Sequence, residues 1–139
     1  MQRKSTRAKK PLVLVVDDFE DGRVLAMEIL KRNGFRVIAA GTGESALDMA
    51  AQMKPDAVLM DLGLPGLDGW EAIRLLKKDP ATRACAVVAY TAHAVRELLD
   101  RARDAGCEGV LTKPCRSAEL VAELERVLRE RSSEVAGHS

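Results

Sequence analysis

The sequence predicts an α/β fold with a doubly wound, five-stranded parallel sheet, and two observations support this prediction. Short apolar runs rich in β-branched residues, which are typical of strands buried on both faces, alternate with segments whose apolar residues recur at helical spacing. This alternation requires right-handed crossovers between parallel strands and places helices on both faces of the sheet. The length of 139 residues and the 47% hydrophobic content fit one such domain with a single core.

Five apolar runs mark the predicted strands. They are residues 12–16, 37–40, 57–60 and 86–90, with residues 109–111 as a weaker fifth candidate. The first run, LVLVV, contains no polar residue and ends at Asp17-Asp18. A strand that is covered by helices on both sides has this composition.

Helical periodicity marks five further segments. Their apolar markers are, in chain order, Leu25, Ile29 and Leu30; Ala46, Leu47, Ala50 and Met53; Ile73 and Leu76; Val95, Leu98, Leu99 and Ala102; and Leu120, Val121, Leu124, Val127 and Leu128. The first four helices are expected to end at Asn33-Gly34, before Pro55, near Asp79-Pro80 and at Gly106. Ser117 is the expected N-cap of the fifth, with Glu119 in its first turn.

The charge distribution separates a basic tail from the rest of the chain. The first ten residues carry +5, whereas the remaining 17 basic and 21 acidic residues leave the rest at about −4. We therefore expect a basic, disordered tail over residues 1–10, a folded domain over 11–129 and a frayed C-terminal tail over 130–139.

Composition argues against several classes of function. The folded part has no basic stripe with interleaved aromatic residues, and aromatic content is 3%, so no nucleic-acid partner is expected. There is neither a long apolar run nor a secretory signal, so we expect no membrane insertion and a cytoplasmic location. Cys85, Cys107 and Cys115 lack the spacing of a metal site and are expected to be reduced thiols.

Polar side chains stand at the ends of four predicted strands. Asp17-Asp18 follows the first strand, Asp61 the third, Thr91 the fourth and Lys113 the fifth. In a doubly wound sheet the carboxyl ends of the strands form the functional crevice. Three carboxylates there would repel one another without a cation, and hard oxygen ligands favour Mg²⁺. Asp61 would then be a nucleophile that forms an acyl phosphate, with the Lys113 ammonium and the Thr91 hydroxyl available to phosphoryl oxygens.

Four segments closely resemble the receiver domains of two-component response regulators, over roughly residues 11–128. They are VLVVDDFED at 13–21, VLMDLGLPGLDGWE at 58–71, VVAYTAHA at 87–94 and GVLTKP at 109–114. The resemblance implies a flavodoxin-like sheet in the order 2-1-3-4-5, with the first and fifth helices on one face and the other three on the opposite face. It also implies a non-enzymatic, single-domain switch similar to chemotaxis regulators. Such a phosphoprotein takes its phosphoryl group from a histidine kinase, or from a histidine phosphotransfer protein in a phosphorelay, and then changes its binding to a downstream protein.

The resemblance also implies roles for individual residues. Asp61 matches the phosphoacceptor. The Mg²⁺ ligands would be Asp18, Asp61 and the backbone carbonyl of Gly63, with Asp17 acting through a water molecule. The Lys113-Pro114 peptide bond is expected to be cis, as it commonly is in the family.

Further positions match residues that bind the phosphoryl group or modulate its effect. Thr91 matches the hydroxyl residue that closes onto the phosphoryl group, and Lys113 matches the cationic one. Gly63 and His93 flank the path of the attacking water, so they are expected to affect the lifetime of the label. Val110 stands where the family usually has Tyr or Phe, so the signal is expected to leave the site through the segment after Thr91.

Each of these residues also has a purely structural interpretation. Asp17 and Asp18 could cap the first helix, and Asp61 could stabilise the loop that follows it. Thr91 could be an ordinary strand residue, and Lys113 a solvated charge. Other features are weaker, because GTGES at 41–45 lacks the lysine of a phosphate-binding loop and Trp70 is explained by packing.

Two other functions would use the same chemistry. An aspartate-nucleophile phosphatase of the haloacid dehalogenase type also combines Asp, Lys and Mg²⁺, but its nucleophile lies at the end of the first strand in a DxD pattern. Here the first strand ends in DDFED and no cap insertion is found. A pseudo-receiver that never takes phosphate is the other alternative, although all of its chemical positions are filled.

Overall fold

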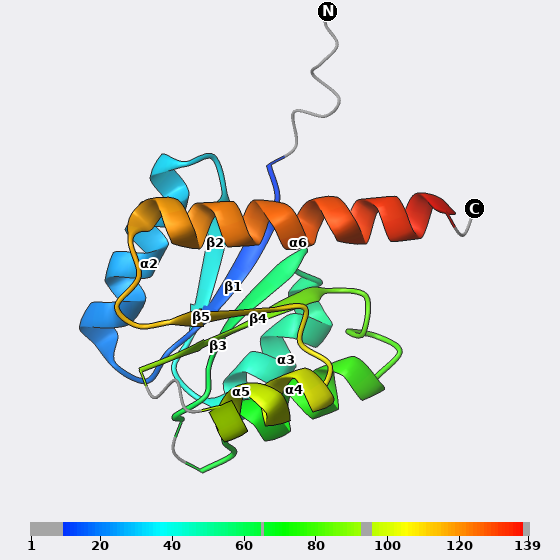
Figure 1. Cartoon of the computed structure of the whole chain (residues 1–139), viewed down its shortest axis with the longest axis horizontal. Helices are drawn as coiled ribbons and strands as arrows, with labels where there is room; N and C mark the ends of the chain where they lie inside the picture. Colours follow the sequence, from blue (N-terminus) through cyan, green and yellow to red (C-terminus); the bar gives the residue numbers. More distant parts are fainter. Residues whose placement is uncertain (1–9, 65, 93–95, 138–139) are drawn as a thin grey trace, which may run out of the picture.

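The computed structural model describes residues 10–64, 66–92 and 96–137, so most of the basic tail, as well as His93 and Val95, lies outside the described residues. The sheet has five parallel strands in the order β2-β1-β3-β4-β5 (Figure 1), as the sequence analysis expects. The strands are β1 (Leu12–Val16), β2 (Arg36–Ala40), β3 (Ala57–Asp61), β4 (Ala86–Thr91) and β5 (Gly109–Thr112).

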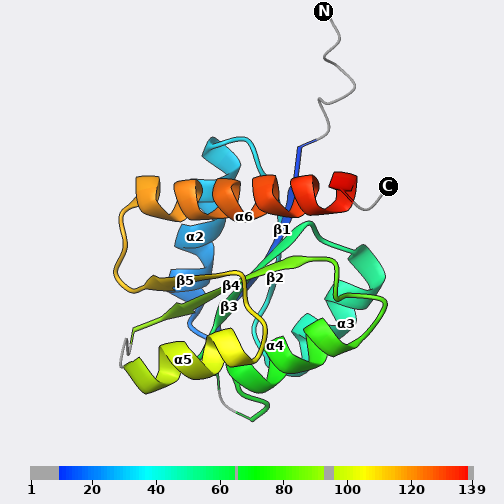
Figure 2. The same ribbon diagram turned by 45° about the vertical axis from the view of Figure 1, so that its right-hand side comes forward.

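Helices cover both faces of this sheet. They are α2 (Glu20–Arg32), α3 (Gly43–Met53), α4 (Gly69–Lys78), α5 (Arg96–Asp104) and α6 (Ser117–Gly137). Figure 2 shows α2 and α6 on one face and α3, α4 and α5 on the other, which is the predicted arrangement. In the described parts of the chain, no helix is long and apolar enough to cross a membrane.

Two hydrophobic clusters, one on each face, explain why the strands are apolar throughout. Along β1, Leu14 and Val16 pack into the cluster with α3, α4 and α5, whereas Val13 and Val15 pack into the cluster with α2 and α6. Successive side chains of a strand point to opposite faces, so a strand with helices on both sides must be apolar at every position. The five residues of β1 are buried accordingly.

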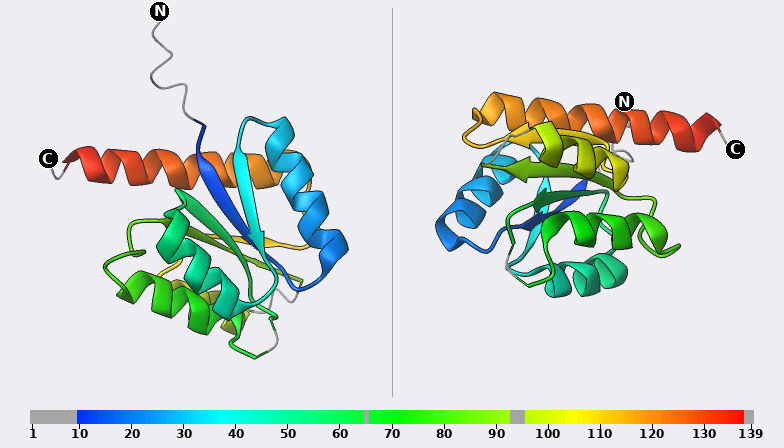
Figure 3. Two further views of the ribbon diagram at one scale, coloured as in Figure 1. Left: turned by 180° about the vertical axis from the view of Figure 1, so that it is seen from behind. Right: turned by 60° about the horizontal axis from the view of Figure 1, so that its bottom comes forward.

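The topological switch point lies between β1 and β3. Strand β1 pairs with β2 on one side and with β3 on the other (Figure 3, left). From β1 the chain therefore first adds β2 at one side and then returns to add β3 at the other side. The strand register places Val16 beside both Ala40 and Met60. The residues that follow β1 and end β3 therefore meet at this edge, which is where ligands bind in doubly wound folds.

Both ends of α6 differ from the sequence prediction. Ser117 is the first residue of the helix, so Arg116 and not Ser117 precedes it. The Glu119 carboxylate accepts a hydrogen bond of 2.8 Å from the backbone N–H of Arg116. The helix runs to Gly137 and so extends into the segment 130–139 that was expected to be a frayed tail. Arg131 contacts the segments before β4 and β3, donating to the carbonyl of Ala84 at 2.7 Å and to Asp56 at 3.1 Å.

Candidate functional site

Three carboxylates gather beyond the ends of β1 and β3. Asp17, Asp18 and Asp61 each offer an oxygen that lies within 4.8 Å of the other two. Asp17 and Asp61 are only 2% and 8% exposed, whereas Asp18 is open to solvent. The cluster thus has two buried acids and one at its mouth.

Backbone hydrogen bonds fix the position of Asp17. Its N–H donates to the carbonyl of Ala40 at 3.1 Å, which continues the pairing of β1 with β2 by one residue. Its Oδ1 accepts from the N–H of Phe19 at 3.0 Å, and its carbonyl accepts from Arg23 Nη1 at 2.8 Å. The N-cap of α2 is Phe19, without a side-chain cap, so neither Asp17 nor Asp18 occupies the capping position.

Asp61 is held by the loop that follows β3 and by the start of α4. Its Oδ1 accepts a hydrogen bond of 2.9 Å from the N–H of Gly63. The backbone of Gly69 approaches so closely that a Cβ there would lie 2.1 Å from the carbonyl oxygen of Asp61. Only glycine permits this approach, which packs the first residue of α4 directly against the peptide of Asp61.

Lys113 connects the two buried acids. Its Nζ lies 3.0 Å from Asp17 Oδ2 and 3.5 Å from Asp61 Oδ2, and its side chain is 25% exposed. The N–H of Lys113 donates to the carbonyl of Thr91 at 2.7 Å, which fixes the start of the side chain relative to β4. The Lys113-Pro114 peptide bond is cis, as predicted.

The electrostatics of this cluster favour a cation. Burial raises the pKa of Asp61 and the charge of Asp17 raises it further, although the Gly63 hydrogen bond and Lys113 act in the opposite direction. Burial alone would lower the pKa of Lys113, but its hydrogen bonds and charge interactions with Asp17 and Asp61 raise it overall. Three carboxylates face one ammonium, which leaves an excess of negative charge in a partly buried crevice. Such a set of hard oxygen donors fits Mg²⁺.

The other predicted site residues differ in their position, and His93 lies outside the described part. Thr91 ends β4 beside Thr112 of β5 and is 2% exposed. Gly63 is exposed, two residues after Asp61. Val110 is partly buried in the cluster beneath α3, α4 and α5.

Sequence reasoning missed the contact between Lys113 and Tyr90. The ammonium lies 4.8 Å from the centroid of the Tyr90 ring, which comes from the residue before Thr91. The sequence shows only that Tyr90 is the one aromatic residue of the strand AVVAYT. Nothing in the sequence indicates that the lysine side chain turns back over this ring.

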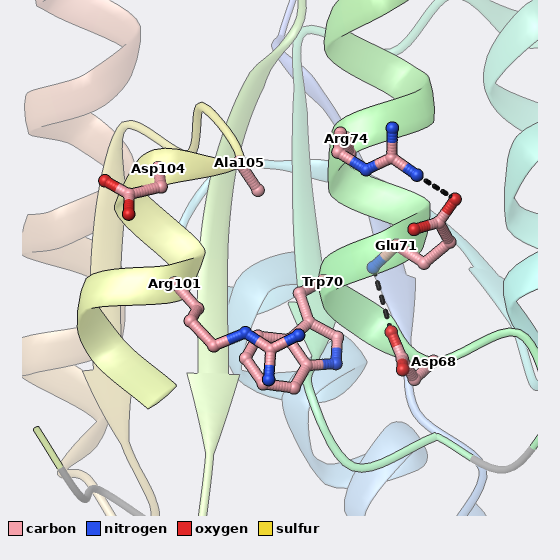
Figure 4. A pocket seen from close by; sticks show the side chains of 7 residues that line it. All are labelled: Asp68, Trp70, Glu71, Arg74, Arg101, Asp104 and Ala105. Carbon is pink, nitrogen blue, oxygen red and sulfur yellow. Dashed lines mark hydrogen bonds and ion pairs between the residues drawn. The ribbon is translucent and has the colours of Figure 1, made fainter. Parts of the chain in front are cut away.

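A separate pocket of about 280 Å³ lies between α4 and α5 (Figure 4). Its wall includes Trp70, whose ring is covered by the guanidinium of Arg101 at 3.2 Å from the centroid. Asp68 caps α4 beside it by accepting from the N–H of Glu71 at 2.9 Å. Trp70 on α4 thus packs against Arg101 of α5, in agreement with its expected packing role. None of the three clustered carboxylates lines this pocket.

A doubly wound sheet with acids at the switch point and a lysine directly after the last strand is the arrangement expected of a phosphoacceptor signalling domain. The family model of the response regulator receiver domain matches residues 13–125, and the chain belongs to this family. The chain is therefore a receiver domain of two-component signalling with a phosphoacceptor role, and the phosphatase and pseudo-receiver alternatives are not favoured.

Individual relatives agree with this assignment. The polar-differentiation response regulator DivK of Brucella anthropi is 36% identical over 102 residues, which cover 73% of this chain and 83% of DivK. The receiver domain of a sensor histidine kinase of Pseudomonas aeruginosa, solved with magnesium in its active-site cleft, is 31% identical with a TM-score of 0.80; the match covers 86% of this chain and 98% of that one. The chemotaxis protein CheY4 of Vibrio cholerae is 25% identical with a TM-score of 0.81, over 85% of this chain and 98% of that one.

Proposed function

We propose that Asp61 accepts a phosphoryl group from the phosphohistidine of a histidine kinase or a histidine phosphotransfer protein. The observation that carries this proposal is the position of Lys113, whose ammonium contacts both Asp17 and Asp61. A phosphoryl group on Asp61 would lie within reach of this ammonium. The ammonium would then leave a carboxylate oxygen and bind a phosphoryl oxygen instead.

The chemical step is a transfer from nitrogen to oxygen. A carboxylate oxygen of Asp61 attacks the phosphorus, the P–N bond breaks, and its electron pair stays on the imidazole of the donor. The product is an acyl phosphate on Asp61. Lys113 and the hydroxyl of Thr91 then bind phosphoryl oxygens and stabilise the charge that develops on them.

The same crevice holds Mg²⁺ in this proposal. Asp18, Asp61 and the carbonyl of Gly63 would be direct ligands, and Asp17 would act through a water molecule. The geometric support is that the three carboxylates converge within 4.8 Å of one another. A bound Mg²⁺ neutralises charge on the phosphoryl oxygens.

The output is a change in binding to a downstream protein. Each chain carries one label at a time and loses it slowly, so the domain acts as a switch and not as a phosphatase with rapid turnover. Gly63 has no side chain to orient an attacking water, and His93 is the second residue that we expect to affect hydrolysis of the label. Val110 is too short to swing between two positions, so we propose that the signal leaves through the segment after Thr91.

Intact-mass spectrometry tests the proposal. Incubation with acetyl phosphate and Mg²⁺ should add one phosphoryl group per chain, and Asp61→Asn should abolish the addition. Asp100→Asn, which changes an exposed aspartate on α5, is the matched control and should be labelled like the wild type. Labelling of the Asp61→Asn protein, or release of many phosphates per chain without a stable label, would contradict the proposal.

A further inference from the structure

Tyr90 occupies a position between the acceptor strand and the lysine. It is the residue before Thr91 in β4, its register partners are Asp61 on β3 and Leu111 on β5, and its carbonyl accepts a hydrogen bond of 3.2 Å from the N–H of Leu62. Its side chain packs, half-buried, against the hydrophobic cluster beneath α2 and α6. The ring therefore starts from a backbone that is fixed on both sides.

The side chain of Tyr90 packs beside the segment that follows β5. Cys115, two residues after Lys113, packs against the same hydrophobic cluster as Tyr90. Burial raises the pKa of Tyr90 to about 12, and the interaction with Cys115 acts in the same direction. The ring thus starts from β4 and lies against the cluster that the segment after β5 also covers.

The ring of Tyr90 lies 4.8 Å from the ammonium of Lys113, within the range of cation–π attraction. A lysine ammonium sits on a flexible stem with many accessible positions. The ammonium of Lys113 forms ion pairs with Asp17 and Asp61. It also contacts the ring of Tyr90, which comes from β4. The attraction to a ring face is less directional than a hydrogen bond, so it can persist while the ammonium changes its oxygen partner.

We propose that Tyr90 is a positioning residue for Lys113. Its packed ring keeps the ammonium near the acceptor oxygen of Asp61, so less conformational freedom is lost when the phosphoryl group binds. This inference rests on the proposed function, because it assigns a role within the same site. It does not require Tyr90 to touch the phosphoryl group.

A double-mutant cycle on the rate of labelling by acetyl phosphate tests the proposal. Loss of the ring in Tyr90→Leu should lower the labelling efficiency by about two- to thirtyfold, the range expected for a cation–π contact. Tyr90→Phe keeps the ring face and should restore most of this loss. In the Lys113→Ala background, Tyr90→Leu should have little further effect, because Tyr90 acts through the ammonium that is already absent. Equal losses in both backgrounds, or a loss in Tyr90→Phe as large as in Tyr90→Leu, would overturn the proposal.

A spectroscopic measurement on the unlabelled protein separates this inference from the proposed function. The ring current of Tyr90 should shift the ε-methylene NMR signals of Lys113, and this shift should be kept in Tyr90→Phe and lost in Tyr90→Leu. Unchanged signals in Tyr90→Leu would overturn the inference even if Asp61 is labelled normally. If the signals move as expected but the wild type takes no label, the contact exists and the proposed function is what fails.

Discussion

Substitution of Gly69 by alanine tests how closely the acceptor strand and α4 must pack. The added Cβ would lie 2.1 Å from the carbonyl oxygen of Asp61 and 2.6 Å from the Cα of Leu62. Both neighbours are backbone atoms, so neither can rotate away as a side chain could. The start of α4 must therefore move away from the peptide of Asp61, and overpacking of this kind costs about 1–3 kcal/mol.

Urea denaturation measures this cost. A loss of about 1–3 kcal/mol corresponds to a midpoint that is lower by roughly 0.5–2 M for a domain of this size. Gly63→Ala is the matched control, because its Cβ would lie 3.6 Å from Asp61 Oδ1, an ordinary contact distance. We expect its free energy of unfolding to stay within about 0.5 kcal/mol of the wild type. If Gly69→Ala unfolds at the same urea concentration as Gly63→Ala, the packing described for the acceptor strand is wrong.

Four further predictions concern the site. Burial raises the pKa of Asp61, so the folded state disfavours its ionised form. Asp61→Asn should therefore unfold at a higher urea concentration than the wild type at neutral pH without Mg²⁺. This difference in stability should vanish as the pH falls below the unfolded pKa of about 3.9, where the carboxyl group is protonated in both states. Asp18→Ala should weaken Mg²⁺ binding in titrations, because a direct ligand is lost. Loss of a residue that only supports a metal ligand typically lowers metal affinity by roughly 10–100-fold, so we expect at least this effect. Decay of the label should change in His93→Ala, and identical decay would make His93 a bystander. Phosphorylation should shift backbone amide NMR signals of residues 91–96 more than that of Val110, and a change centred on β5 would contradict this route.

The sequence predicted the fold well because its signals were local and repeated. Leu14 and Val15 are both buried, on opposite faces, and a run without polar residues is the direct consequence. The placement of Asp17, Asp61 and Lys113 near one another followed from the rule that parallel strands end at the same edge. The contacts among these three side chains confirm that this edge of the sheet was predicted correctly.

The parts that sequence reasoning missed depend on contacts between distant residues. Arg131 on α6 donates hydrogen bonds to Ala84 and Asp56, and no local pattern near residue 131 indicates these partners. The contact of Lys113 with Tyr90 depends on how a lysine side chain turns after the chain has folded. The roles of the site residues in phosphoryl transfer, the downstream partner and the cytoplasmic location stay predictions.

The measurement that tests the central claim most directly is the identification of the labelled residue. Borohydride reduces an aspartyl phosphate to homoserine, which peptide mass spectrometry can locate in the chain. After labelling in the presence of Mg²⁺, we predict homoserine at position 61 and unmodified aspartates at positions 17 and 18. Homoserine at position 17 or 18, or a label that borohydride does not convert, would contradict the assignment of Asp61 as the acceptor.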